Sequence, residues 1–474
     1  DARGMNLTEL LELDEYDPSP TGSSLDAFER QLALAGVRLA GRIMLKRKMG
    51  KAAFADIRDS SERIQVYFKI DEVGQQAFDL FDLLDIGDIV GCEGTFFVTR
   101  TGERTLKVKT FELLSKSLHP LPDKHAGLTD VEIRYRRRYA DLIVNHEVRD
   151  IFVQRTRIIQ SLRDFLNSHG FLEVETPILQ PLYGGASARP FKTHHNYLDM
   201  DLYLRIAPEL YHKRCIVGDL DGVYEIGKNF RNEDIDGQHY PEYTSLELYQ
   251  AYADYEDIMD LTESILYDAA MHIVGSDKIK YGDRVLDFSR PWRRVTMHDA
   301  IKEYTGLDIS SFKTVEEAKA AAVKLGVRDI EDCDGIGKIV SELFDQKAQP
   351  NLVNPTFVID HPVEVSPLAK RKRGNPALVE RFELFINGWE FANAFSELND
   401  PSEQEQRFRD QERYRDEGDD EAHPIDMDYV NALEYGLPPT GGLGIGVDRF
   451  AMILTNAPSI KEVILFPHMK PEQA

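Results

Sequence analysis

Between residues 36 and 118, apolar and polar side chains alternate one by one in short runs, a pattern that favours strands over helices. In one run Ala53, Ala55 and Ile57 share a face, and Phe54 lies on the opposite face among polar neighbours. The pattern continues with a strand at 64–68, a helix at about 73–84, and strands at about 88–99 and 105–114. This order over about 80 residues predicts a small all-β OB-fold barrel, a common platform for single-stranded nucleic acid.

A basic stripe runs along the first part of this segment. Residues 37–55 contain no acid and six bases: Arg38, Arg42, Lys46, Arg47, Lys48 and Lys51. These cations suit phosphates, and Phe54 beside them suits base stacking, although exposed aromatic residues are often incidental. The formal net charge of −25 argues against a protein that coats nucleic acid non-specifically, because such a protein would be basic overall.

Composition narrows the class further. No apolar run approaches the ~18 residues of a membrane span, so no membrane partner is expected. The three cysteines Cys92, Cys215 and Cys333 lie far apart, which argues against a disulfide framework or zinc site and favours a cytoplasmic protein. The chain begins at Asp1 instead of methionine, so we expect that residues precede it.

Patterning divides the chain into four segments. We expect an N-terminal arm at 1–35, the barrel at 36–118, a linker at 119–140 and a catalytic domain at 141–474. The last segment mixes helices with long strands, which is typical of an α+β domain. Helical periodicity around 295–345 predicts an inserted helical subdomain.

Three separated segments of the last domain carry candidate chemistry: 170–177, 230–249 and 441–450. The glycine run in the third is neither a Rossmann fingerprint nor a P-loop. It indicates a strand that runs into a helix whose first turn carries Arg449. Small residues there allow a flat ligand to approach the backbone, or simply allow close packing of strand and helix.

The second segment reads as two antiparallel strands. Alternation places Tyr243, Glu247 and Tyr249 on one face, and Arg231 and Glu233 share a face of the partner strand. An arginine fork suits a phosphate and an aromatic ring suits an adenine, whereas buried Glu–Arg pairs can also be purely structural.

In this order the three segments resemble motifs 1, 2 and 3 of the class II aminoacyl-tRNA synthetases. The resemblance is closer to the lysyl enzymes at 184–191, 193–196, 204–210 and 393–400. It covers residues 36–470, including the barrel. It implies an antiparallel-sheet catalytic domain, an anticodon-binding barrel and a homodimer with motif 1 at its interface. The implied reaction is ATP-dependent activation of L-lysine and transfer of the lysyl group to the 3′ end of tRNA(Lys).

The resemblance also implies residue roles by position. Catalysis would rest on Arg231 and Arg449, and Mg²⁺ would bind Glu383 and Glu390. ATP would contact Arg231, Glu233, His239, Tyr243, Glu383, Glu390 and Arg449. Lysine would contact Gly185, Glu209, Arg231, Glu247, Tyr249, Asn393, Phe395 and Glu397. The anticodon would contact Arg47, Phe54, Gln65 and Glu103.

The chemistry of this set favours lysine. Glu209, Glu247 and Glu397 suit a substrate with two ammonium groups, and Tyr249 and Phe395 suit its aliphatic stem. An aspartyl pocket would instead need a basic residue for the substrate's side chain. Clustered acids can also be metal ligands, but the aromatic neighbours favour lysine.

The strand register near the metal ligands is ambiguous. Asn387 and Gly388 predict a two-residue hairpin turn, which would set Glu383 opposite Ala392. Strict alternation then sends Asn393 to the face opposite Glu390, so either a β-bulge separates these two residues or the register differs.

The motif 2 loop departs from the usual family pattern at Asp234, Gln238 and Tyr240. We therefore expect weakened contacts with ATP but an unchanged reaction class. Two rival functions would share these motifs: a lysine-activating ligase that modifies a protein, and a nucleic-acid-binding or regulatory protein with an inactive synthetase domain. The barrel argues against the first, and the second is disfavoured by the intact Arg231, Glu383, Glu390 and Arg449.

Overall fold

The computed structural model describes residues 36–122, 128–186, 188–331, 333–416 and 424–472. The expected N-terminal arm at 1–35 lies outside these residues. The chain forms two compact units, which meet between Asn145 and His146. Each unit has its own core and is described by itself.

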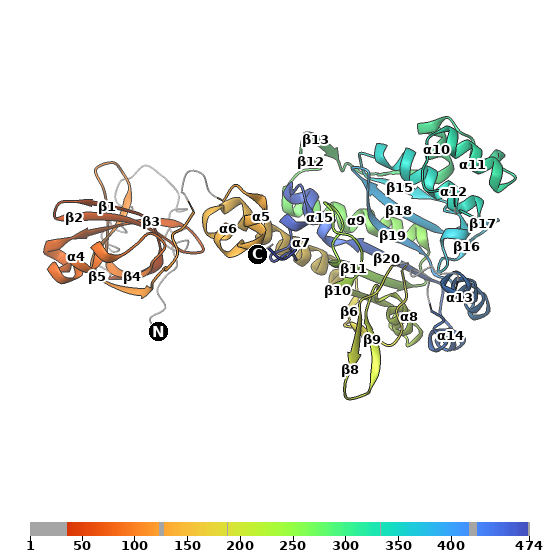
Figure 1. The fold of residues 1–474 in the computed structure, drawn as a ribbon, viewed down its shortest axis with the longest axis horizontal. Coiled ribbons are helices and arrows are strands. Elements are labelled where there is room, and N and C mark those ends of the chain that lie inside the picture. Colours follow the sequence, from red (N-terminus) through yellow and green to blue (C-terminus); the bar gives the residue numbers. More distant parts are fainter. Residues whose placement is uncertain (1–35, 123–127, 187, 332, 417–423, 473–474) are drawn as a thin grey trace. The chain divides into compact units, whose positions relative to one another are not determined.

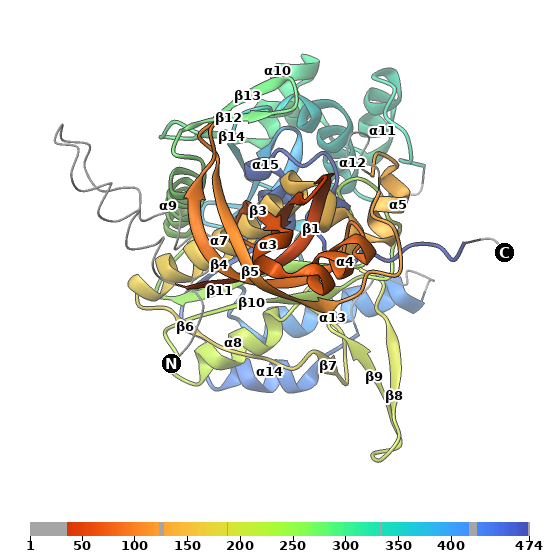
Figure 2. The ribbon, with the colours of Figure 1, turned by 90° about the vertical axis from the view of Figure 1, so that its left-hand side faces the viewer.

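The first unit contains a closed five-stranded barrel in the order β1-β2-β3-β5-β4. Its elements are β1 (Val37–Met49), β2 (Ala52–Arg58), β3 (Arg63–Lys69), α3 (Ile70–Val73), α4 (Gln75–Leu83), β4 (Ile89–Val98) and β5 (Arg104–Ser115). Figure 2 shows the long antiparallel pair β4 and β5 side by side. Ala53, Ala55 and Ile57 point into the core with Val66 and Phe68, so the predicted alternation and the OB fold are confirmed.

The segment expected as a linker contains helical structure. Helices α5 (Val131–Arg136) and α6 (Arg138–Val144) follow the barrel and belong to the first unit. Asp130 caps α5 by accepting a hydrogen bond from the backbone N–H of Ile133. Within α6, the buried Arg138 donates to Asp141 at 2.6 Å.

The second unit is built on an eight-stranded sheet in the order β14-β15-β18-β19-β20-β11-β10-β6 (Figure 1). The strands are β6 (Leu172–Glu173), β10 (Gly222–Phe230), β11 (Glu242–Ala251), β14 (Arg293–Thr296), β15 (Thr356–Ile359), β18 (Arg381–Ile386), β19 (Trp389–Ser396) and β20 (Thr440–Gly446). The six strands from β15 to β10 are antiparallel, and the two edge strands pair in parallel. This confirms the expected α+β fold with a largely antiparallel catalytic sheet.

Helices cover both faces of this sheet. The largest core joins it to α7 (His146–Ser168), α9 (Tyr255–Val274) and α15 (Val447–Thr455). A second core joins β10 and β11 to α8 (Glu209–Val217), α13 (Pro401–Asp416) and α14 (Met427–Glu434). Leu246 and Leu248 of β11 point into the largest core, while Tyr249 belongs to the second, as the alternation predicts.

The remaining elements surround the sheet. Helices α10 (Met297–Thr305), α11 (Val315–Lys324) and α12 (Ile336–Leu343) share a core that also includes Val358 of β15 and Phe385 of β18. The hairpin of β8 (Lys192–His195) and β9 (Met200–Leu204), with β7 (Leu179–Gln180), projects from the body of this unit (Figure 1). Two small hairpins are β12 (Lys278–Tyr281) with β13 (Arg284–Asp287) and β16 (Arg371–Lys372) with β17 (Asn375–Val379).

A β-bulge at Phe391 resolves the register of β18 and β19. Asn387 and Gly388 form the predicted tight turn, both with positive φ. Leu384 pairs with Ala392 and Phe385 pairs with Glu390, so Phe391 is the extra residue. Glu383 therefore lies opposite Asn393, and the simple pairing with Ala392 was wrong. The bulge shifts the alternation, so that Glu390 and Asn393 face the same way.

Candidate active site

A cavity of about 550 Å³ opens on one face of the sheet, over the neighbouring strands β18, β19, β20 and β11. Every residue that the sequence assigned to ATP or lysine lines it. These are Gly185, Glu209, Arg231, Glu233, His239, Tyr243, Glu247, Tyr249, Glu383, Glu390, Asn393, Phe395, Glu397 and Arg449. The structure thus brings together residues from three distant parts of the chain.

Arg231 follows the end of β10 and lies over the ring of Tyr243, with 5.3 Å from the guanidinium carbon to the ring centre. Its Nε is buried and has no hydrogen-bond partner among the described residues, so it is available to a ligand. Arg231 and Glu233 do not share a strand face as expected, because β10 ends at Phe230 and both residues lie in the following turn. Glu233 is exposed at the cavity rim.

Asp448, which was not predicted from the sequence to have a role, holds motif 3 against the neighbouring elements. Asp448 accepts hydrogen bonds from the Arg155 side chain of α7 and from the backbone N–H of Thr244, both at 2.7 Å. The next residue, Arg449, donates to the backbone oxygen of Glu390 at 2.6 Å. Helix α7, strand β11 and helix α15 are therefore tied together where Arg449 enters the cavity.

A glycine allows the sheet to pack against the acidic end of the cavity. A Cβ at Gly442 would lie 2.0 Å from Glu397 Oε1 and 2.6 Å from the Tyr249 ring. Gly185 has φ +88°, and a Cβ there would lie 2.9 Å from Glu209 Cβ. Side chains at these positions would displace the groups that form the pocket.

Three buried carboxylates gather at this end. Glu209, Glu247 and Glu397 are 5%, 8% and 1% exposed. Burial raises the pKa of Glu247 to about 8, with a further contribution from the Glu209 carboxylate. Burial likewise raises the pKa of Glu397 and of Glu209. Asn229, another residue missed from the sequence, donates to Glu247 at 3.1 Å and to Ser245 at 2.8 Å.

Glu383 and Glu390 lie at the other end of the cavity. Burial raises the pKa of Glu390, and the neighbouring Glu383 carboxylate adds to this effect. Arg381 donates to Glu383 at 2.5 Å and to Asn393 at 3.1 Å. Arg381 was missed, although its spacing of two from Glu383 on one strand was the available signal.

The motif 2 loop is held by its own contacts. Asp236 accepts from the backbone N–H groups of Gln238 and His239 and pairs with the His239 ring at 2.7 Å. Gln238 lines the cavity, and its backbone oxygen accepts from Arg449 at 3.4 Å. The buried Tyr240 instead accepts from the backbone N–H of His468 at 2.5 Å.

On the barrel, Phe54 belongs to a row of three rings. Its ring centre lies 4.8 Å from that of Tyr67, which lies 5.8 Å from that of Phe97. All three side chains are half-buried. Tyr67 and Phe97 were not predicted to bind nucleic acid, although Tyr67 alternates with core residues in the same way as Phe54.

The other predicted anticodon residues flank this row. Arg47 is exposed and lies opposite Phe54 in the β1–β2 ladder. Gln65 is buried, and its amide donates to the exposed Glu103 at 3.1 Å and accepts from Thr105 at 3.1 Å. Gln65 is therefore held in place by two neighbours, and only the edge of its side chain is accessible.

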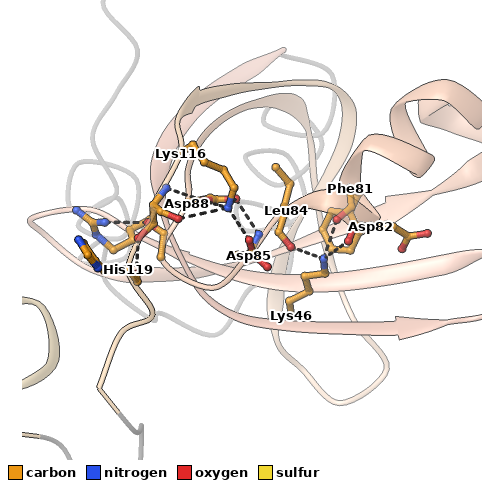
Figure 3. Close-up of polar contacts among 11 residues, drawn as sticks. Lys46, Phe81, Asp82, Leu84, Asp85, Asp88, Lys116 and His119 are labelled. Carbon is orange, nitrogen blue, oxygen red and sulfur yellow. Dashed lines mark hydrogen bonds and ion pairs between the residues drawn. The ribbon is translucent and has the colours of Figure 1, made fainter.

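Most of the basic side chains in the stripe make contacts within the barrel. Lys46 caps the C-terminal end of α4 by donating to the backbone oxygens of Phe81, Asp82 and Leu84, and Lys116 lies nearby with Asp85 and Asp88 (Figure 3). Arg38 pairs with Glu93, Arg42 donates to the Gly87 oxygen, and Lys48 pairs with Asp82. Within the described part of the stripe, Arg47 and Lys51 remain without such a partner, which reduces the free positive charge that the sequence suggested.

Comparisons with known proteins agree with this geometry. Residues 130–470 match the family described as tRNA synthetases class II (D, K and N), and residues 37–114 match the OB-fold nucleic acid binding domain. The lysine–tRNA ligase of Carboxydothermus hydrogenoformans is 56% identical over 447 residues, covering 94% of this chain and 91% of that protein. The lysine–tRNA ligase of Staphylococcus aureus is 54% identical over 434 residues, covering 92% and 88%. This chain therefore belongs to the class II aminoacyl-tRNA synthetases, within the lysyl-tRNA synthetase family.

Proposed function

We propose that this protein activates L-lysine with ATP and transfers the lysyl group to the 3′ end of tRNA(Lys). The observation that carries this proposal is the cavity itself, whose lining combines three buried carboxylates with Arg231 and Arg449. An amino acid with two ammonium groups fits the carboxylates, and a polyphosphate fits the arginines.

In the first step, the lysine carboxylate attacks the α-phosphorus of ATP and pyrophosphate leaves. Arg231 neutralises the charge that develops on the α-phosphate, and Arg449 holds the departing phosphates. The backbone oxygens of Glu390 and Gln238 accept hydrogen bonds from Arg449 and so orient it. Catalysis on this account is positioning plus electrostatics, with no side-chain nucleophile.

In the second step, the terminal ribose hydroxyl of the tRNA attacks the carbonyl carbon of lysyl-adenylate. The carbon–oxygen bond to AMP breaks and AMP leaves with the phosphate charge. The hydroxyl proton passes to solvent as the new ester forms. The half-buried Arg231 stays beside the leaving phosphate in this step, so the same guanidinium serves both reactions.

The residues present fit Mg²⁺. Glu383 and Glu390 provide carboxylate oxygens, which Mg²⁺ prefers together with phosphate oxygens, and a cation there would relieve the repulsion that raises the pKa of Glu390. When bound, Mg²⁺ would neutralise phosphate charge. Among the described residues, no group of three or more His, Cys, Asp or Glu side chains is placed so that it could hold a metal ion.

The barrel supports tRNA as the acceptor. The row of Phe54, Tyr67 and Phe97 offers ring faces to bases, and Arg47 and Lys51 offer charge to phosphates. We propose that Arg47, Phe54, Gln65 and Glu103 contact the anticodon. A protein acceptor would leave this surface without a role.

Assembly and compartment are further parts of the proposal. Apolar side chains around motif 1 are exposed, among them Val153, Leu172, Ile178 and Leu179, which supports a homodimer across this surface. The three cysteines are unpaired, which supports a reducing cytoplasm. None of the helices in the described part of the chain is long and apolar enough to cross a membrane.

ATP–pyrophosphate exchange measured with each standard amino acid tests the reaction. We expect exchange with lysine in the absence of tRNA, followed by charging of tRNA(Lys) when it is added. Exchange that requires aspartate or asparagine, or no exchange at all, would refute the proposal. Light scattering of the same preparation tests the dimer.

A further inference from the structure

A buried lysine lies directly behind the wall of the amino-acid end of the cavity. Lys213 is on α8, one turn after Glu209, and its side chain is 0% exposed. Its Nζ lies 2.5 Å from Glu209 Oε1 and 2.5 Å from Glu397 Oε2. The two carboxylates come from distant parts of the chain, since Glu209 begins α8 and Glu397 follows β19. One ammonium therefore bridges two of the three pocket acids.

The charges explain why such a bridge is useful. Three buried carboxylates, Glu209, Glu247 and Glu397, would repel one another strongly in an enclosed site. When all three acids are ionised, as ammonium groups of a bound substrate require, Lys213 cancels one of the three charges and leaves two. Free lysine carries two ammonium groups, one on its α-carbon and one on its side chain, and its carboxylate is left for Arg231. The pocket charge thus matches the substrate's ammonium groups.

The surroundings keep Lys213 charged. Burial opposes the charge, but the carboxylates of Glu209 and Glu397 outweigh it and raise the pKa of Lys213 above its usual value. The rings of Phe395 and Tyr429 lie on either side, each with its centre 5.7 Å from Nζ. The other titratable or charged groups that face this cluster are Glu247, Tyr249 and Arg381.

We propose that Lys213 is a positioning residue that holds Glu209 and Glu397 in place and favours their ionised forms, and so fits the pocket to an amino acid with two ammonium groups. The inference rests on the proposed lysine activation. Lys213 itself does not contact the substrate, because it is not among the described residues that line the cavity. It acts only through the two carboxylates.

Removal of the Lys213 charge changes the protonation of the facing carboxylates, which loss of packing alone would not do. In Lys213→Met the side chain is similar in size, but Glu209 and Glu397 lose the cation that lowers the pKa of each, so their carboxyl groups keep protons to higher pH. Lysine binding must then displace more proton than in the wild type. The lysine KM of the variant should therefore fall more steeply with rising pH than the lysine KM of the wild type.

The test compares wild type, Lys213→Met and Lys213→Gln in lysine-dependent ATP–pyrophosphate exchange from pH 6.5 to 8.5. We expect the lysine KM to rise at least tenfold at pH 7, with the ATP KM unchanged within twofold and partial recovery at pH 8.5. Lys302→Met is the matched control, because Lys302 pairs with Asp308 at an exposed site. Lys213→Arg should recover part of the lysine affinity at pH 7.

Circular dichroism melts establish that each variant is folded. If Lys213→Met does not fold, Lys213→Gln decides, since its amide can still donate to one carboxylate without charge. A lysine KM within twofold of wild type overturns the inference, as does a raised KM whose pH profile parallels that of the wild type. If the wild type itself shows no lysine-dependent exchange, the proposed function fails and this inference fails with it.

Discussion

Glu247 lies at the centre of the amino-acid pocket, on β11 between Tyr243 and Tyr249. Its carboxyl group accepts a hydrogen bond from Asn229, whereas Lys213 is ion-paired with the other two acids. Glu247 is therefore the pocket carboxylate most available to an incoming ammonium group.

We expect Glu247→Gln to raise the lysine KM strongly and to leave the fold nearly unchanged. Loss of one charged hydrogen bond in a closed site costs about 2–4 kcal/mol. Steady-state exchange kinetics and a thermal melt measure both effects. Wild-type lysine kinetics in the variant would place Glu247 outside the pocket.

Lysine activation should also depend on pH through Glu247. Burial raises the pKa of this carboxylate to about 8, so it is largely protonated at pH 7 in the empty pocket. An ammonium group binds the ionised form, and lysine must therefore displace a proton. We expect kcat/KM for lysine to rise between pH 6.5 and 8.5 in the wild type, and this rise to be reduced in Glu247→Gln. A flat wild-type profile would contradict it.

At the scale of elements, the motif 2 loop sets the ATP contacts. Gln238 lines the cavity beside Arg449, so an arginine there would add a cation near the phosphates. We expect Gln238→Arg to lower the ATP KM by an amount that corresponds to about 1 kcal/mol of binding free energy. The gain is small because the new side chain is partly solvated and must be ordered on binding. The lysine KM should barely change. An unchanged ATP KM would mean that the side chain turns away from the phosphates.

The barrel face makes a separate element-scale prediction. The ring of Phe54 lies beside that of Tyr67 at an angle of 41°, and base stacking on an aromatic ring contributes about 1–3 kcal/mol. Phe54→Ala should weaken charging of tRNA(Lys) by that amount and leave exchange without tRNA intact. Comparison with an anticodon-altered tRNA is the control. If wild type and variant charge the altered tRNA equally well, and the native tRNA equally well, the barrel face does not read the anticodon.

At the scale of the whole molecule, the two units have separate cores. Val66 is fully buried in the barrel core, which contains no residue of the second unit. Val66→Ala should destabilise the barrel by about 2 kcal/mol through lost burial and a cavity. Tm of the barrel transition should fall and tRNA charging should weaken at elevated temperature, while exchange persists. A parallel loss of exchange would show that the two units unfold together.

The sequence by itself determined the barrel strands, the Asn387–Gly388 turn and the candidate ATP and lysine residues, all of which line the cavity. Local alternation carries this information, because side chains two apart on a strand share a face, as Tyr243, Glu247 and Tyr249 do. The family motifs added the residues that lie far apart in sequence.

Only the tertiary structure decided the rest. The bulge at Phe391 reverses the alternation of side chains between the two faces of β19. No local sequence pattern predicts where a strand gains one extra residue. The basic stripe loses most of its free charge to acids and backbone oxygens elsewhere in the barrel. Lys213 acquires its place between Glu209 and Glu397 because α8 and the end of β19 meet in space. Ion pairs between distant segments depend on how the chain packs, and sequence spacing does not encode that distance.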